Sequence, residues 1–246
     1  MSENKSKKIQ TYGLFGFGLL TIILWNIPGG GLILYPFTIL GTWFHEMAHG
    51  ITAMLLGGDF KELVIFPNGS GYAQFEYSSL FLGSFSKAII AAAGPIGPSI
   101  AGAVFILASV NKKTTEWTLY IFSFLLIVSS LIWVRPLISW GFLIVILLSA
   151  IATLISLKAN DNFKVLTLQF LAVQAFISVY LSIGYLFSSG AMVGGTQNVS
   201  DTQAIAEILL LPYWFWGALI LAFNGLMIYL SLKYYFRKTN HREQYN

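Results

Sequence analysis

The sequence predicts an all-α polytopic membrane protein with about six to seven transmembrane helices and a small β-hairpin between its second and third apolar segments. Of the 246 residues, 56% are hydrophobic and only 10% are charged, and the mean hydropathy is +0.72. Soluble domains carry about 25% charged residues. The apolar stretches of this chain repeatedly exceed the roughly 18 residues that mark a membrane-spanning helix. We therefore expect a multi-pass protein of the lipid bilayer.

The apolar segments define the candidate helices of a single domain over residues 1–246. Short polar or Gly- and Pro-marked connections separate them, and no internal repeat divides them. The segments are residues 12–27, 32–56, 86–110, 117–134, 136–157, 164–187 and 205–236. Residues 1–11 and 237–246 are expected to be polar basic tails. The first segment lacks a small-residue cleavage site, so we expect a helix there rather than a signal peptide.

Basic residues lie in short clusters at the ends of the apolar segments. Such clusters set topology and contact lipid headgroups, so no nucleic-acid partner is expected despite the net charge of +4. Seven crossings would place six basic residues on one side and eight on the other, which assigns no orientation. Either one segment does not cross fully, with residues 12–34 or the turn at Arg135 as candidates, or charge does not set the orientation.

Residues 61–75 interrupt the helical pattern. They read KELVIFPNGSGYAQF, two β-prone runs around a Gly-rich turn, which predicts a β-hairpin. Among membrane helices, the backbone polar groups of a hairpin must all be paired. We expect Ile65, Phe66, Gly69 and Gly71 to contact a substrate strand that adds to the hairpin edge. The alternative is an extramembrane loop with a tight turn.

The second apolar segment contains His45-Glu46-Met47-Ala48-His49, an HExxH motif. Histidines four residues apart on a helix share one face, so both can bind one zinc ion. Zinc lowers the pKa of a bound water to about 7, and Glu46 is placed to act as the catalytic base toward that water. The alternative is a set of core polar residues. A charged side chain in an apolar segment costs about 2.5–3.5 kcal/mol, which favours a functional role.

A catalytic zinc site needs a third protein ligand, and few residues can supply it. The chain contains no cysteine, which also excludes disulfides and a cysteine nucleophile. The only other histidine, His241, lies in the basic tail. Most acidic residues lie at the termini or in loops, which leaves Asp201 and Glu207 at the start of the last segment. An Asp after Ser at a helix start is equally an ordinary N-cap. Composition alone therefore leaves Asp201 open between zinc ligand and helix cap, and Glu207 is the weaker candidate for the third ligand.

Several short motifs occur together between residues 40 and 217. They are residues 45–50 (HEMAHG), 56–58 (LGG), 67–71 (PNGSG), 93–98 (AGPIGP) and 200–204 (SDTQA), followed by Leu211-Pro212 and Trp216. This set resembles the bacterial branch of the site-2 protease family of intramembrane zinc metallopeptidases. The resemblance implies that His45, His49 and Asp201 bind zinc and that Glu46 is the base. The better-studied members carry Gly after the Asp and Asn after the Gly-Pro element, where this chain has Thr202 and Gly97-Pro98.

Gly94 and Pro95 are expected to open the helix at residues 86–110. Small residues let helices approach closely, and proline interrupts the hydrogen-bond ladder. An opened helix would admit water and a substrate backbone to the metal, which makes both residues candidates for substrate binding. The alternative is a packing and kink element without a direct role.

The sequence therefore predicts an intramembrane zinc endopeptidase in a bacterial cell membrane. Its expected cofactor is Zn²⁺, and its expected partners are single-span membrane-protein substrates. The alternative is a catalytically silent scaffold or binding protein that retains the metallopeptidase fold. A rhomboid-like serine protease would need a serine facing a histidine, for which residues 188–190 are the nearest pattern. A transporter would show inverted repeats, and the sequence has none.

Overall fold

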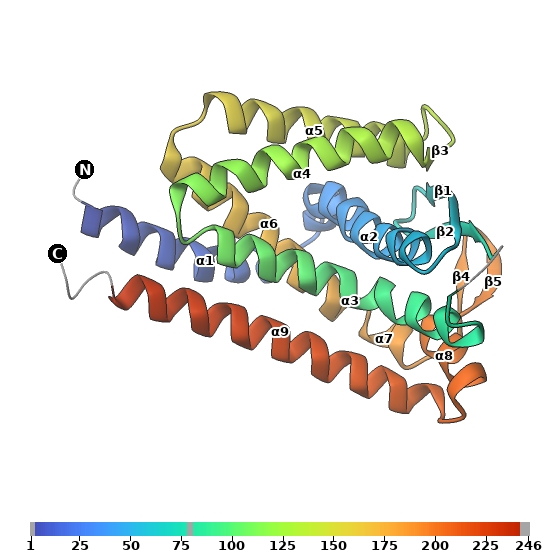
Figure 1. Cartoon of the computed structure of the whole chain (residues 1–246). Coiled ribbons are helices and arrows are strands. Elements are labelled where there is room, and N and C mark those ends of the chain that lie inside the picture. The colour runs from blue at the N-terminus through green and yellow to red at the C-terminus, as the bar shows by residue number, and fades with distance from the viewer. Residues whose placement is uncertain (1–2, 78–80, 242–246) are drawn as a thin grey trace.

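The chain folds into a bundle of long helices with two small β-sheets at one end (Figure 1). The computed structural model describes residues 3–77 and 81–241. Its helices are α1 (Glu3–Asn26), α2 (Gly30–Leu55), α3 (Ser84–Ala108), α4 (Lys112–Ile132), α5 (Trp140–Lys158), α6 (Asp161–Leu181), α7 (Ile183–Leu186), α8 (Asp201–Leu209) and α9 (Tyr213–His241). Its strands are β1 (Asp59–Ile65), β2 (Gly71–Glu76), β3 (Val134–Arg135), β4 (Gly190–Val193) and β5 (Thr196–Val199). The predicted helical fold and its hairpin are confirmed.

Within the described residues, five helices are long and apolar enough to cross a membrane: α3, α4, α5, α6 and most of α9. Helices α1 and α2 form a sixth candidate, a pair bent by 117° at the short break between them. Gly29 has a φ of 79° at this bend, and a Cβ at Gly30 would lie 1.8 Å from the Leu24 carbonyl oxygen. Only glycine fits such a close approach. The first two apolar segments therefore count as one candidate span, broken at the bend, and not as two.

Two predicted segments are divided in the structure. The segment at 164–187 ends as α6 at Leu181, and the short α7 follows it. The segment at 205–236 is interrupted between α8 and α9, because Leu210 adopts a left-handed conformation with a φ of 66° and Pro212 has no N–H to continue a helix. The predicted tails are largely helical, since α1 begins at Glu3 and α9 continues to His241. Residues 1–2 and 242–246 lie outside the described residues.

Both termini lie at the same end of the bundle, opposite the two sheets, α7 and α8 (Figure 1). An even number of crossings produces this arrangement. Only Lys61, Lys87 and Arg135 of the chain's 14 basic residues lie in or beside segments at the sheet end. The others occur near the termini and at the α3–α4 and α5–α6 connections. Cytoplasmic loops carry an excess of Lys and Arg, so we expect the terminal end to face the cytoplasm.

This orientation is measurable because the chain contains no cysteine. We expect a membrane-impermeant maleimide added to intact cells to label Asp59→Cys in β1 and to leave Lys113→Cys unlabelled until the cells are permeabilised. Both positions are exposed in the structure. The reverse labelling pattern would show that the basic end faces outward.

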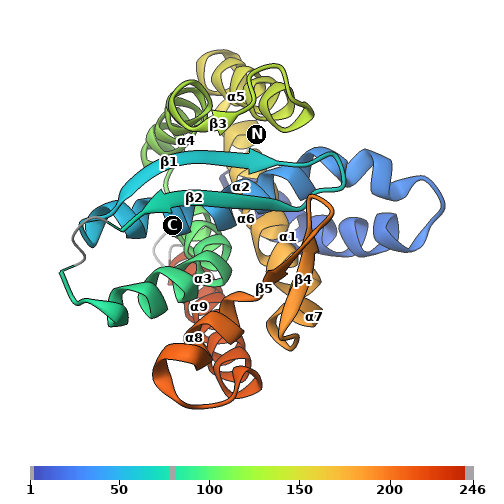
Figure 2. The same cartoon turned by 90° about the vertical axis from the view of Figure 1, so that its right-hand side faces the viewer.

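The β1–β2 hairpin lies across α2, and the β4–β5 hairpin approaches its turn (Figure 2). The first sheet has the order β2-β1-β3, so β2 is a free edge. Helix α2 holds the hairpin turn through two hydroxyl groups: Tyr35 donates to the Pro67 carbonyl at 2.7 Å, and Thr42 donates to the Gly69 carbonyl. Tyr35, Thr42 and Glu46 recur at helical spacing on one side of α2. The same helix therefore positions the hairpin and the predicted base.

The opposite side of α2 is fixed in the hydrophobic core. The Phe44 ring stacks on Phe122 of α4 with centroids 5.9 Å apart and meets Phe105 of α3 edge to face. The Trp43 indole N–H donates to Ser129 Oγ at 3.0 Å. Aromatic pairs of this geometry contribute about 0.5–1.5 kcal/mol each beyond area burial. This packing sets the rotation of α2 about its axis and with it the direction of the HExxH side chains.

Candidate metal centre

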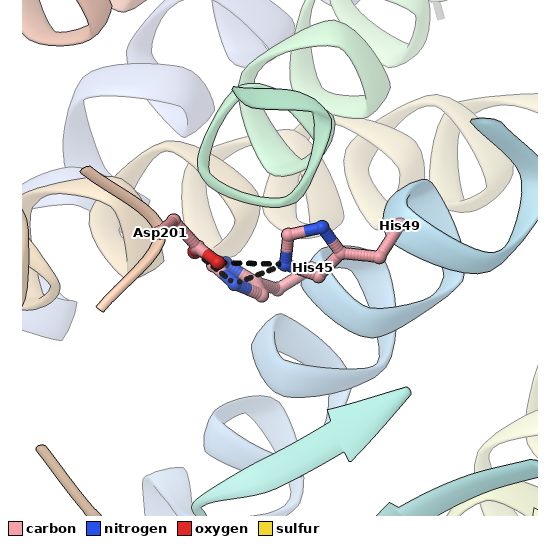
Figure 3. A group of neighbouring side chains, drawn as sticks. All are labelled: His45, His49 and Asp201. Atoms are coloured by element: carbon pink, nitrogen blue, oxygen red, sulfur yellow. Dashed lines mark hydrogen bonds and ion pairs between the residues drawn. The ribbon is translucent and has the colours of Figure 1, made fainter. Parts of the chain in front are cut away.

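Helix α2 presents His45 and His49 one turn apart, with their Nε2 atoms 3.1 Å from each other (Figure 3). The Nδ1 atom of His49 lies 2.7 Å from the Ile90 carbonyl oxygen of α3. When Nδ1–H donates to that carbonyl, Nε2 carries the lone pair that can bind a metal. A Cβ at Gly94 would lie 2.1 Å from His49 Nε2. Glycine at position 94 therefore leaves the space that the imidazole ring occupies.

Asp201, the first residue of α8, meets both imidazoles. Its Oδ2 lies 3.0 Å from Nε2 of His45, and its Oδ1 lies 3.3 Å from Nε2 of His49. The N-cap of α8 is Ser200, whose Oγ accepts the Gln203 N–H at 3.2 Å. Capping is thus performed by Ser200, and the Asp201 carboxylate is left to face the histidines.

Glu207, the other acidic candidate, is exposed on the last turn of α8. Its Oε1 accepts a hydrogen bond from Gln203 Nε2 at 3.2 Å. It is not part of the cluster of His45, His49 and Asp201. The structure therefore brings Asp201, and not Glu207, to the two histidines.

The three side chains fit a zinc ion. Tetrahedral zinc with ligands at about 2.0–2.1 Å separates its donor atoms by about 3.3 Å. One Asp201 oxygen lies 3.0 Å from His45 Nε2, the other lies 3.3 Å from His49 Nε2, and the two Nε2 atoms are 3.1 Å apart. With one donor atom from each residue, the three atoms lie within 4.8 Å of one another. Asp201 Oδ2 is buried, and apart from its 3.0 Å contact with His45 Nε2 it has no polar partner among the described residues. Burial of a carboxylate is unfavourable unless its charge is balanced, and a cation between the three side chains would balance it.

Glu46 is buried beside this cluster, with 7% of its surface exposed. It lines the same cavity as His45, a space of about 300 Å³. The Glu46 Cγ lies 3.4 Å from the position that a Cβ would take at Gly71, the first residue of β2. The free strand edge therefore runs directly beside the predicted base.

The residues predicted to contact substrate divide into two groups. Gly69, Gly71 and Pro95 line the cavity together with His45 and Glu46. The others lie outside its lining. Ile65 is 2% exposed and packs against Gly141 of α5. Phe66 contacts Gly194 at the tip of the β4–β5 hairpin, and Gly94 backs the His49 ring.

The Gly-Pro element of α3 is a close-packing site as well as part of the cavity wall. A Cβ at Gly97 would lie 2.5 Å from the Ala48 Cβ of α2. On the other side of α3, Asn224 of α9 donates from Nδ2 to the Pro95 carbonyl at 3.0 Å and accepts from Ser99 Oγ at 2.5 Å. An amide from a distant helix thus satisfies polar groups beside the proline, as interrupted membrane helices require.

Sequence reasoning missed part of the cavity wall. Tyr185 and the strand residues Ala191, Met192 and Val193 line the cavity. The β4–β5 hairpin could have been predicted, because a Gly-Gly pair, Gly194-Gly195, lies between two short runs. In the structure both glycines have positive φ, at 57° and 85°, as such a turn requires. Nothing in the sequence near Tyr185 signals its position.

The comparisons with known proteins agree with this site. The sequence profile of the Peptidase M50B-like family matches residues 16–231. No curated protein and no solved structure shows significant similarity to the chain. The matched range contains both histidines, Glu46, the hairpin, the Gly-Pro element and Asp201. Its helices make the protein a multi-pass membrane protein. The chain therefore belongs to the Peptidase M50B-like family, a site-2 protease family of membrane metallopeptidases that are in general zinc-dependent.

Proposed function

We propose that this protein is an intramembrane zinc endopeptidase that hydrolyses peptide bonds of membrane-protein substrates. The convergence of His45, His49 and Asp201 beside Glu46, in a cavity bordered by a free strand edge, carries the proposal. A silent scaffold of the same fold would gain no stability from a buried carboxylate held against two imidazoles with a second buried carboxylate, Glu46, beside them.

Each polar residue of the site has a chemical role in this proposal. His45, His49 and Asp201 would hold Zn²⁺, which when bound supplies a Lewis acid and water acidic enough to react near neutral pH. Glu46 accepts the proton of the attacking water and passes it to the leaving nitrogen. The Ile90 carbonyl fixes the His49 ring, 2.7 Å from its Nδ1, and so keeps Nε2 directed at the cluster.

The substrate is proposed to lie as an extended segment along β2. A strand that adds to a free sheet edge is held by main-chain hydrogen bonds. Gly69 and Gly71 have no side chains to block the approach of another backbone, and they border the cavity near Glu46. Pro95 and the β4 residues Ala191–Val193 form other parts of the wall. The space thus favours an unwound peptide.

A transmembrane helix must unwind locally before its carbonyl groups become accessible, since each accepts an intrahelical hydrogen bond. We expect single-span peptides with Gly or Pro near the cut to be cleaved faster than matched peptides with Leu at those positions. The relative helix cost of about 1 kcal/mol for Gly and about 3 kcal/mol for Pro corresponds to about fivefold and about 10²-fold. Mass spectrometry of the products in detergent micelles measures both the rate and the cut position.

The same assay tests the metal. Chelation should stop cleavage and added zinc should restore it. Cleavage that survives complete metal removal would contradict a metallopeptidase. Equal or faster cleavage of the all-Leu peptide would contradict only the unwinding requirement.

A further inference from the structure

Tyr185 lies in the cavity wall next to the metal cluster. It belongs to the short α7 between α6 and the β4–β5 hairpin and lines the cavity with His45 and Glu46. Its ring centroid is 6.2 Å from that of His45, in an edge-to-face arrangement. The backbone N–H of Asp201 donates to the Tyr185 hydroxyl at 3.1 Å. This contact holds the phenolic oxygen against the backbone of a candidate metal ligand.

The other hydroxyl and amide side chains of the cavity wall already donate to partners within the protein. They are Thr38, Thr42, Ser70, Gln174, Ser178 and Ser182. Tyr185 differs from them, because its hydroxyl oxygen accepts a hydrogen bond from Asp201 and its proton remains to be donated. The Asp201 carboxylate interacts electrostatically with the Tyr185 hydroxyl. A carboxylate that holds a metal ion would leave this proton for a ligand in the cavity.

Peptide hydrolysis creates a need for such a donor. The water oxygen bonds to the carbonyl carbon, its proton goes to Glu46, and the carbonyl π electrons move to the carbonyl oxygen. A preorganised donor aimed at that oxygen stabilises the developing charge more than it stabilises the starting amide. In the next step the carbonyl re-forms, the C–N bond breaks and the nitrogen takes the proton from Glu46. A hydrogen-bond donor keeps its own proton throughout.

We infer that Tyr185 is a second catalytic residue, whose O–H donates to the carbonyl oxygen of the scissile bond as that oxygen becomes negative. This inference rests on the proposed peptidase function. It assigns the two sides of the reaction to different residues: Glu46 moves the proton of water, and Tyr185 stabilises the oxyanion.

The test is Tyr185→Phe, which keeps the ring and removes the hydroxyl. We expect kcat on the Gly- and Pro-containing peptide to fall about 10²- to 10³-fold, as for the loss of one oxyanion donor, with KM little changed. The zinc affinity of the metal-free variant should stay within a few-fold of that of the wild type. The visible spectrum of the cobalt-substituted variant should be unchanged. A phosphinic peptide has oxygens that mimic the oxyanion. Its affinity for the variant should be about tenfold or more below its affinity for the wild type, after correction for any change in the affinity of an amide peptide.

Tyr180→Phe is the matched control, because Tyr180 lies on α6 with 71% of its surface exposed, and it should match the wild type. A kcat for Tyr185→Phe within threefold of the wild type would overturn the inference. A fall in zinc affinity parallel to the fall in activity would also overturn it, because Tyr185 would then act only by holding the Asp201 backbone. If the wild-type protein cleaves no peptide, or cleaves after metal removal, the proposed function itself fails.

Discussion

Replacing Glu46 with Gln is expected to abolish peptide hydrolysis while zinc stays bound. The amide has nearly the same shape as the carboxylate but cannot accept a proton from water. Glu46 is buried beside the cluster and is not one of its three donors, so the metal should be retained. General-base catalysis contributes about 10²- to 10⁴-fold, which corresponds to about 3–5 kcal/mol of barrier. Single-turnover cleavage of a single-span peptide, with metal content measured on the same sample, gives both quantities.

The control for this experiment is Glu207→Gln, which makes the same chemical change at an exposed carboxylate of α8 and should leave the rate unchanged. Appreciable turnover by Glu46→Gln would exclude Glu46 as the base. Loss of zinc from the same variant would instead place Glu46 among the ligands, although the converging group of described residues contains only His45, His49 and Asp201.

Asp201→Ala is expected to remove zinc and activity together. It would leave the two imidazoles as the only members of the cluster, and catalytic zinc is normally held by three protein ligands. The loss of a residue that only hydrogen-bonds to a ligand already costs 10- to 100-fold in metal affinity. We therefore expect a loss of more than about 100-fold. Titration of the metal-free protein against buffered zinc measures the affinity.

Glu207→Ala is the matched control, because it removes a carboxylate six residues away on the same helix. It should bind zinc as the wild type does. If Glu207→Ala loses the metal and Asp201→Ala retains it, the third ligand has been misassigned.

Much of the site follows from local helix geometry. His45 and His49 share a face of α2 because residues four apart on a helix always do. The hairpin after α2 follows from two β-prone runs around a Gly-rich turn, and no distant contact is needed to predict it. The hydropathy of the segments likewise fixes the membrane environment. These features depend on residues that are close in sequence, so the sequence alone is sufficient to predict them.

The third ligand required the tertiary structure. Asp201 and Glu207 lie on the same short helix and were both acceptable by composition, and an Asp after Ser is also a plausible cap. The structure separates them because Ser200 caps the helix and the packing of α8 turns Asp201 toward α2. That approach joins residues about 150 positions apart in the chain, and no periodicity in the sequence encodes it.

The sequence by itself determined the membrane-embedded helices, the hairpin and the HExxH pair, because hydrophobic period and helical spacing are local properties. Only the tertiary structure decided where α1 and α2 bend, where the last segment breaks, and which distant side chains complete the cavity. Gly30 is needed at the bend because the Leu24 carbonyl approaches it, and Tyr185 reaches the cluster because α7 turns the chain back toward Asp201. Both depend on contacts between segments, whose energies arise only when the segments have packed.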